Sequence, residues 1–216
     1  MAEPLKVRVA KDAGFCFGVR DAIEKAREVA AKHGKVYMLG DIVHNERVVS
    51  QLEQENIRVV DTLDDVEDAP ILFRAHGTIP ELWEQAAQKN LDIVDATCPL
   101  VHDIHDEIKK LHTEQRKLLI IGDHGHDEVI GIQAQVPHAI VISSVAEAES
   151  LPRMKKAGVV SQSTQMIENV QEIIGILSMK IFDLRFVNTV CFPTRRNQGQ
   201  IKEIAPISDV MIIVGS

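Results

Sequence analysis

The sequence has few aromatic residues and no excess of positive charge. Only 4% of its 216 residues are Phe, Trp or Tyr, too few for the stacking surface that single-stranded nucleic acids need. Lys and Arg number 24 against 32 Asp and Glu, so the net charge is −8 and no basic patch is present to neutralise phosphates. We therefore expect no nucleic-acid partner.

Membrane and secretion signals are also missing. No apolar run approaches the roughly 18 residues that a membrane-spanning helix needs, and the first residues contain no signal-peptide core. The three cysteines are an odd number at long spacings, which argues against a disulfide framework. The sequence therefore predicts a cytoplasmic protein with no membrane partner, whose reduced thiols are core residues, nucleophiles or metal ligands.

Two nucleotide-binding motifs are absent. The sequence has no G-x-x-x-x-G-K-[ST] and no G-x-G-x-x-G after a predicted strand. Neither a nucleoside triphosphate nor a bound nicotinamide is therefore indicated. If the protein catalyses a redox reaction, its electrons must come from another protein.

Apolar segments of strand length alternate with amphipathic helical segments along the chain. This alternation predicts an α/β fold with parallel sheets and crossover helices, and it extends to strands at residues 5–10 and 209–214. The cysteines recur at comparable intervals, each at a junction, so we predict repeated small α/β units. The predicted units are residues 13–97, residues 98–191, and a partial third unit made of residues 1–12 and 192–216.

Cys16, Cys98 and Cys191 each stand where a predicted strand turns into a helix. A helix amino end favours a thiolate through its dipole. Three thiolates without a clear fourth suit a cubane iron–sulfur cluster with one iron open to substrate, because complete four-cysteine ligation normally serves electron transfer. A non-catalytic scaffold with zinc in a Cys/His site is the main alternative. A hydrolase with Cys16 as its nucleophile is another.

Histidines follow several of the predicted strands. Open parallel sheets bind ligands at the carboxyl ends of their strands, and His44, His76 and His126 all lie there. Such histidines suit a small anionic ligand such as a diphosphate, with isolated surface histidines as the alternative. A second set lies on the helix after Cys98 and is expected to face solvent: His102, His105 and His112.

A carboxylate and two hydroxyls lie at further strand ends. Glu128 begins a helix, where it is either a partner of the helix dipole or, in a water-poor site, a proton donor with a raised pKa. Ser163 and Thr164 are candidates for relaying that proton or holding a substrate hydroxyl, with helix capping as the alternative.

Seven motifs occur together in one order along residues 6–216. They are Gly14-Phe15-Cys16-Phe17-Gly18-Val19, Val43-His44-Asn45, Ala75-His76-Gly77, Asp95-Ala96-Thr97-Cys98-Pro99, Gly125-His126-Asp127-Glu128-Val129, Ser161-Gln162-Ser163-Thr164 and Asn188-Thr189-Val190-Cys191. In this order the motifs closely resemble those of the 4-hydroxy-3-methylbut-2-enyl diphosphate reductase family, also called the LytB/IspH family.

The resemblance implies a pseudo-threefold α/β protein around a central [4Fe–4S] cluster. It implies metal ligation by Cys16, Cys98 and Cys191, proton delivery by Glu128, and substrate binding by His44, His76, His126, Ser163 and Thr164. The implied reaction is the two-electron reductive dehydroxylation of 4-hydroxy-3-methylbut-2-enyl diphosphate to isopentenyl and dimethylallyl diphosphate in non-mevalonate isoprenoid biosynthesis. Ferredoxin or flavodoxin is the implied electron donor.

The chain departs from the family pattern at three places. Ser163-Thr164 stands where the family usually has Thr-Thr, which keeps the hydroxyls, and Asn197-Gln198 stands where it often has Arg-Gln. The family also continues past Ser216 with a Ser/Ala-Asn motif that binds the diphosphate. We therefore expect a chain truncated before the end of its third unit, whose pocket lacks a wall and whose own activity is impaired.

Overall fold

The computed structural model describes residues 6–42 and 45–214 of the chain. It contains two four-stranded sheets in which all neighbouring strands are parallel. The first sheet consists, in spatial order, of β2 (Ile57–Val60), β1 (Val36–Leu39), β3 (Ile71–Phe73) and β4 (Ile93–Asp95). The second consists of β6 (Ile140–Ile142), β5 (Lys117–Ile121), β7 (Met154–Ser161) and β8 (Ile181–Phe186).

The two sheets have the same strand order, β2-β1-β3-β4 and β6-β5-β7-β8. This repeat confirms the predicted α/β fold of repeated small units with parallel sheets. The first sheet lies within residues 13–97 and the second within residues 98–191. The unit boundaries themselves, and the partial third unit of residues 1–12 and 192–216, stay predictions.

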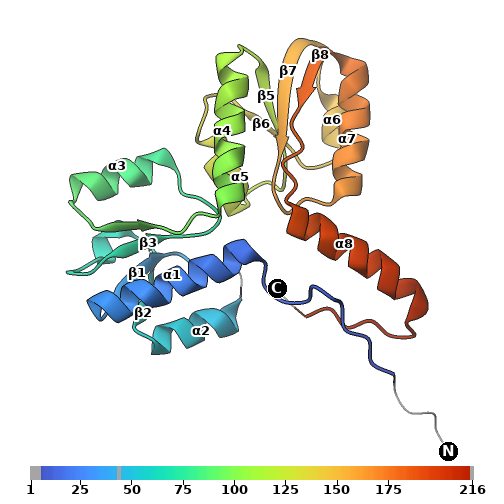
Figure 1. Ribbon diagram of the computed structural model, residues 1–216. Helices are drawn as coiled ribbons and strands as arrows, with labels where there is room; N and C mark the ends of the chain where they lie inside the picture. The colour runs from blue at the N-terminus through green and yellow to red at the C-terminus, as the bar shows by residue number, and fades with distance from the viewer. Residues whose placement is uncertain (1–5, 43–44, 215–216) are drawn as a thin grey trace, which may run out of the picture.

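Helices connect the strands and cover the sheets (Figure 1). The α-helices are α1 (Phe17–His33), α2 (Glu46–Gln54), α3 (Pro80–Gln88), α4 (Pro99–Thr113), α5 (Asp127–Gln133), α6 (Val145–Ser150), α7 (Ile167–Lys180) and α8 (Phe192–Ile204). Short 3-10 helices lie at η1 (Leu63–Asp65) and η2 (Ala205–Ile207). None of the helices within residues 6–42 and 45–214 is long and apolar enough to cross a membrane.

Each sheet is buried on both faces because alternate strand residues point to opposite helical layers. In the first sheet, Met38 packs in the cluster with α1 and α2, whereas Tyr37 packs in the cluster with α3. In the second, Leu119 packs in the cluster with α6 and α7, whereas Ile120 packs in the cluster with α4 and α5. Burial on both faces explains why these strands read as continuous apolar runs.

The two terminal segments differ from the prediction. Residues 5–10 and 209–214 were expected to be strands, but no strand occurs in their described parts, 6–10 and 209–214. A strand needs a neighbouring backbone, and the N-terminal segment is instead held beside α8 by side chains. The backbone N–H of Asp12 donates to Gln200 Oε1 at 3.1 Å, and Arg196 forms an ion pair with Asp12 at 3.2 Å. The apolar side chains of both segments remain largely exposed.

Candidate functional site

Each of the three cysteines occupies the N-cap position of a helix. Cys16 precedes α1, Cys98 precedes α4 and Cys191 precedes α8, and none of these helices has an acidic residue in its first turn. The first N–H groups of a helix have no partner within the helix, and its dipole is positive at this end. The fold therefore places every cysteine beside the first N–H groups of a helix.

Several contacts bring the three cysteines together. A Cβ atom added at Gly18 would lie 2.6 Å from Cys98 Sγ, so the first turn of α1 rests on Cys98. The rings of Phe17 and Phe192 stack with centroids 5.9 Å apart, which joins the starts of α1 and α8. Burial raises the pKa of the Cys98 thiol, and the nearby charges of Cys16 and Cys191 raise it further. The three thiols therefore lie in one electrostatic environment.

The turns before Cys98 and Cys191 are built in the same way. The Asp95 carboxylate accepts a hydrogen bond from the Thr97 backbone N–H at 2.9 Å, and the Asn188 side chain accepts one from the Val190 N–H at 3.2 Å. Asp and Asn favour such turns because their short side chains reach a backbone N–H two residues on. The repeated units thus present Cys98 and Cys191 from equivalent loops.

Each of these two cysteines is also tied to the loop of the adjacent strand. The backbone N–H of Cys98 donates to the carbonyl oxygen of Ala75 at 3.0 Å, and that of Cys191 donates to the carbonyl oxygen of Ser163 at 2.9 Å. Ala75 directly precedes His76. The thiols and the predicted substrate-binding residues are therefore fixed to one another through the backbone.

Thr194 contacts a thiol and was not among the predicted site residues. Its Oγ1 lies 3.0 Å from Cys191 Sγ. A hydroxyl three residues after an N-cap cysteine lies in the first helical turn and can donate a hydrogen bond to a thiolate. The Cys-x-x-Thr spacing in the sequence would have indicated this residue.

Substituting Gly18 by Ala is expected to disturb the thiol site. The new methyl group would lie 2.6 Å from Cys98 Sγ, and such overpacking costs about 1–3 kcal/mol. Gly175→Ala in α7 is the matched control, because its methyl group meets no atom within 4 Å and helix propensity alone predicts a gain of about 0.5–1 kcal/mol. Urea unfolding of the two variants should give opposite signs, and equal stability changes would contradict the contact.

Two of the three predicted substrate histidines face each other. His76 follows β3 and His126 follows β5, and their rings are perpendicular with centroids 6.1 Å apart. His126 is the N-cap of α5, and its Nδ1 accepts a hydrogen bond from the Glu128 backbone N–H at 3.1 Å. A neutral His126 ring therefore carries its proton on Nε2, which can donate to an anion. The third predicted histidine, His44, lies outside the described residues.

An ion pair joins the loops that carry these histidines. Arg74, two residues before His76, contacts the carboxylate of Asp127, the neighbour of His126, at 2.8 Å. Both side chains are about one-third exposed. The pair directly connects the loop after β3, in the first sheet, to the start of α5, which follows β5 of the second sheet.

Glu128 is almost completely buried, with 1% of its surface exposed. Its two carboxylate oxygens accept hydrogen bonds from the Ser163 backbone N–H at 2.5 Å and from the Ser163 hydroxyl at 2.7 Å. Burial raises the pKa of Glu128, and the two bonds from Ser163 oppose that rise without cancelling it. A carboxyl group in this environment retains its proton to higher pH than an exposed Glu does.

The two hydroxyl residues after β7 lie in different environments. Ser163 is buried and its hydroxyl is engaged with Glu128, whereas Thr164 is exposed. The Gln162 side chain donates to Thr164 Oγ1 at 2.8 Å, so the Thr164 hydroxyl hydrogen remains available to another acceptor. The helix-capping alternative is wrong, because the N-cap of α7 is Met166.

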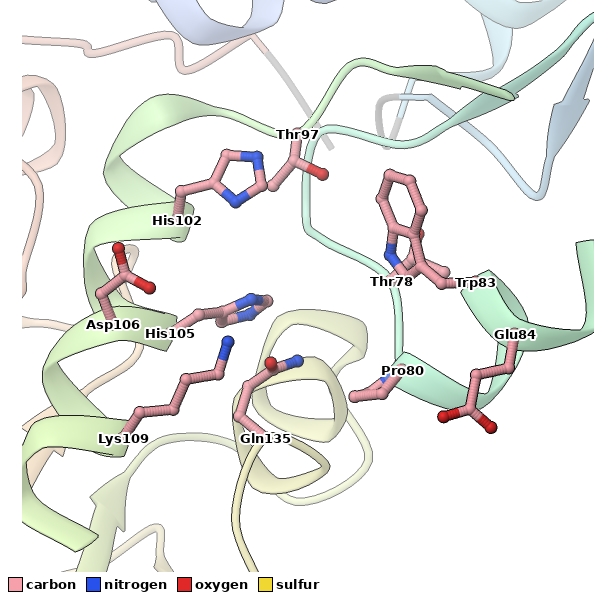
Figure 2. A pocket seen from close by; sticks show the side chains of 10 residues that line it. All are labelled: Thr78, Pro80, Trp83, Glu84, Thr97, His102, His105, Asp106, Lys109 and Gln135. Carbon is pink, nitrogen blue, oxygen red and sulfur yellow. The ribbon is translucent and has the colours of Figure 1, made fainter. Parts of the chain in front are cut away.

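A separate cavity of about 440 Å³ lies between α3 and α4 (Figure 2). Lys109 projects from α4 on one side and Trp83 closes the other side from α3. The expectation that His105 faces solvent is wrong: only 6% of its surface is exposed, and its ring packs against Gly77 of the first unit. None of the predicted site residues lines this cavity.

Acidification is expected to destabilise the fold through His105. Burial, reinforced by the charges of Lys109 and His102, lowers the pKa of His105 from 6.5 to about 4. The folded state therefore binds this proton more weakly than the unfolded chain does, and stability is lost as pH falls below 6.5. The loss between pH 7.5 and pH 5 is about 2 kcal/mol. Urea unfolding of wild type and His105→Gln at both pH values checks this, since equal pH dependence would contradict it.

The side chains at the three helix starts are all thiols. Within residues 6–42 and 45–214, no three Cys, His, Asp or Glu side chains are close enough to hold one metal ion together. Thiolate ligands are those that iron–sulfur clusters use, and a four-iron cluster needs its ligands further apart than one zinc ion does. The three N-cap cysteines are ligands of the kind that an iron–sulfur cluster uses.

Comparison with known proteins gives a consistent result. Residues 7–216 match the family model described as LytB protein. The 4-hydroxy-3-methylbut-2-enyl diphosphate reductase of Geobacter metallireducens is 37% identical over 212 residues, which are 98% of this chain and 75% of the relative. That of Geotalea uraniireducens is 38% identical with the same coverage.

Solved structures agree with the sequence matches. The E-1-hydroxy-2-methyl-but-2-enyl-4-diphosphate reductase of Plasmodium falciparum has a TM-score of 0.91 and 31% identity, and covers 95% of this chain and 67% of its own. A structure titled as (E)-4-hydroxy-3-methyl-but-2-enyl diphosphate reductase, the terminal enzyme of the non-mevalonate pathway, has a TM-score of 0.79 and 32% identity, with 97% and 76% covered. The chain therefore belongs to the LytB family, the family of the 4-hydroxy-3-methylbut-2-enyl diphosphate reductases, which are oxidoreductases.

Proposed function

We propose that this chain reduces 4-hydroxy-3-methylbut-2-enyl diphosphate to isopentenyl and dimethylallyl diphosphate, using a [4Fe–4S] cluster held by Cys16, Cys98 and Cys191. The observation that carries the proposal is the meeting of three N-cap cysteines beside a buried Glu128. Glu128 is linked to Cys191 through Ser163, which donates to the carboxylate and accepts from the cysteine N–H. A proton donor and the thiol site are thus parts of one hydrogen-bonded unit.

The reaction consumes two electrons and two protons and releases one water. Hydroxide is a poor leaving group, so the C–O bond breaks more easily when the departing oxygen receives a proton. When bound, the cluster supplies electrons and a Lewis-acidic iron with an open position. The protein residues supply the proton, the orientation of the substrate and the exclusion of water.

Glu128 is proposed as the proton donor. Its raised pKa keeps the carboxyl group protonated nearer to neutral pH, which a general acid requires. The Ser163 N–H and hydroxyl fix both oxygens, so the acid is held in one orientation. Because the carboxyl group is buried, bulk water does not compete with the substrate for the proton of Glu128.

The diphosphate is proposed to lie between the two histidine loops. His126 carries its proton on Nε2 when the ring is neutral, and the His76 ring stands perpendicular to it. Thr164 adds an exposed hydroxyl on the β7 side. We include His44, which follows β1 as His126 follows β5, in this set as a proposal from the sequence alone.

The remaining partners follow from the chemistry. A reductase without a nucleotide-binding motif needs a protein electron donor, and we propose ferredoxin or flavodoxin. Reduced thiols are typical of cytoplasmic proteins, so we propose that this chain and its electron donor are located in the cytoplasm.

Oxygen-free purification and reconstitution test the proposal. We expect brown protein with about four iron and four sulfide per chain. Turnover of 4-hydroxy-3-methylbut-2-enyl diphosphate with reduced methyl viologen should release the two five-carbon diphosphates. Colourless protein with one zinc per chain and no turnover would contradict the proposal.

A further inference from the structure

We infer that two copies of this chain associate through the outer edge of β8, which joins their second sheets into one across a twofold axis. β8 is the last strand of its sheet, and within the described part of the chain it pairs with β7 alone (Figure 1). The inference does not depend on the proposed function, because it concerns a strand edge and not the thiol site.

The outer edge of β8 is longer than the other sheet edges. β8 has six residues, whereas the other three outer strands, β2, β6 and β4, have four, three and three. A long outer strand is a template for another chain, and proteins commonly keep such strands short or covered. β4 holds the same place in the first sheet, and there Lys25 of α1 donates to the carbonyl oxygen of Asp95 at 2.5 Å.

Alternate residues of β8 direct their backbone groups away from the sheet. The N–H of Val187 donates to the carbonyl oxygen of Val159 at 2.9 Å, and Val159 is the register partner of Phe186. In a parallel ladder, alternate residues of a strand bond to the same neighbour. The residues of β8 at odd positions therefore face β7 with their N–H and C=O groups, and those at even positions face outward, where a second strand can bond to them.

The side chains of β8 are complementary to an antiparallel copy of themselves. The segment reads Phe182-Asp183-Leu184-Arg185-Phe186. With the twofold axis at Leu184, each Asp183 faces Arg185 of the second copy. In the same register each Phe182 faces Phe186 of the second copy, and the pairs at even positions are the hydrogen-bonded ones. Opposite charges and aromatic pairs directly across an antiparallel ladder stabilise it, so backbone, charge and aromatic contacts all favour one register.

The exposed side chains of this edge are apolar at its start. Phe182 is 94% exposed, and Met179, the second residue before β8, is 80% exposed. Leu184 and Phe186 are half-buried against the cluster that contains α7 residues. A single exposed apolar residue needs no explanation, but a group of them beside outward-facing backbone indicates a contact surface.

The charged residues of β8 specify the orientation of the second copy. Both are exposed, and their ion pairs within the chain are Arg116 with Asp183 at 3.0 Å and Arg185 with Glu114. Exposed pairs of this kind contribute little to stability, so the side chains can also pair with a second copy. An in-register parallel pairing would place like charges opposite each other, whereas the antiparallel pairing places opposite charges there.

The first test reverses one charge of β8 at a time. The reconstituted full chain is prepared as wild type, Asp183→Arg and Arg185→Asp, with Arg58→Asp on the outer strand β2 as the exposed charge control. Sedimentation over a dilution series gives the dimer dissociation constant. Each reversal on β8 should raise that constant about 10–100-fold, because both cross-strand pairs become repulsive, and the control should leave it within about twofold of wild type. An equimolar mixture of the two β8 variants should dimerise again, because each then faces the opposite charge.

Three results would overturn the inference: wild type that stays monomeric at every concentration, β8 variants that dimerise as wild type does, or a mixture that stays monomeric. A loss in Arg58→Asp equal to that of the β8 variants would also overturn it, since the effect would then not belong to β8.

The second test removes a backbone donor. The N–H of Leu184 points away from β7, so Leu184→Pro removes no bond of the sheet, and proline is tolerated on an outer strand in this position. Leu184→Ala is the matched control, because it loses similar packing and keeps the N–H. We expect the proline variant to be monomeric and the alanine variant to dimerise, with folding of both checked by circular dichroism. Equal dimerisation of the two folded variants would contradict pairing through the β8 edge.

Discussion

Replacing Glu128 by Gln is expected to lower turnover by about 10²–10⁴-fold, because a general acid contributes an acceleration of that size. The amide keeps the volume of the carboxyl group and its oxygen can still accept from the Ser163 N–H, which lies 2.5 Å from Glu128 Oε1. Substrate affinity, iron content and the unfolding transition should therefore remain near wild type. Full activity in this variant would remove Glu128 from the mechanism.

The matched control is Glu46→Gln, at the start of α2. Glu46 stands in the first turn of its helix, as Glu128 does, but it is exposed. Loss of charge alone should leave turnover within about twofold of wild type there, since an exposed carboxylate at a helix start contributes only about 0.3–1 kcal/mol to stability. An equal loss in both variants would indicate a structural effect.

The pH dependence of the Glu128→Gln variant provides an independent check. The pKa of Glu128 is raised above 4.5 by burial, so the folded state binds this proton more tightly than the unfolded chain does. This binding stabilises the fold at low pH, and the contribution is lost as pH rises through the raised pKa. Between pH 4.5 and neutrality the variant should show a smaller decline in stability than wild type.

Replacing Cys98 by Ser is expected to abolish cluster binding and to reduce turnover to background. Cys98 is the thiol that the other two sites share, since α1 packs on its sulfur at Gly18 and the charges of Cys16 and Cys191 both act on it. A serine hydroxyl is a hard ligand that does not replace a soft thiolate for iron. Iron and sulfide content after oxygen-free reconstitution measures the effect.

Met166→Ser is the sulfur-to-hydroxyl control for this experiment, because Met166 is 61% exposed and lies outside the site. It should retain wild-type iron content and colour. If Cys98→Ser also retained about four iron per chain, the proposed ligand set would be wrong.

Local sequence patterns predicted a helix or strand correctly where the interactions that form it are local. Residues 118–121 form a continuous apolar run and the strand β5 indeed spans Lys117–Ile121, because helices cover both faces of that sheet. The three cysteines were expected at helix starts and are found there. The apolar spacing of the sequence predicts a helix over residues 21–33, whereas α1 begins four residues earlier, at Phe17, because Cys16 caps the helix without a side-chain hydrogen bond and so leaves no capping pattern to recognise.

Features that depend on contacts between distant segments could not be predicted from local sequence patterns. His105 lies off the apolar stripe of α4, and it is buried because Gly77 and Gly131, which are distant in the sequence, lie against its ring. The bonds between Glu128 and Ser163 join residues 35 positions apart, so the different roles of Ser163 and Thr164 became distinct only in the folded chain. The terminal segments had a strand pattern, but a pattern does not specify a neighbouring strand.

The arrangement of the cysteines has a consequence for biosynthesis. Cys16 and Cys98 leave the ribosome before Cys191 and the helix it caps. In the folded chain the Cys191 N–H donates to the carbonyl oxygen of Ser163, shortly after the segment in which β8 pairs with β7. Under the proposed ligation, a nascent chain therefore carries two of the three thiols before the third is made, and the proposed cluster can be held by all three only after Cys191 has been translated.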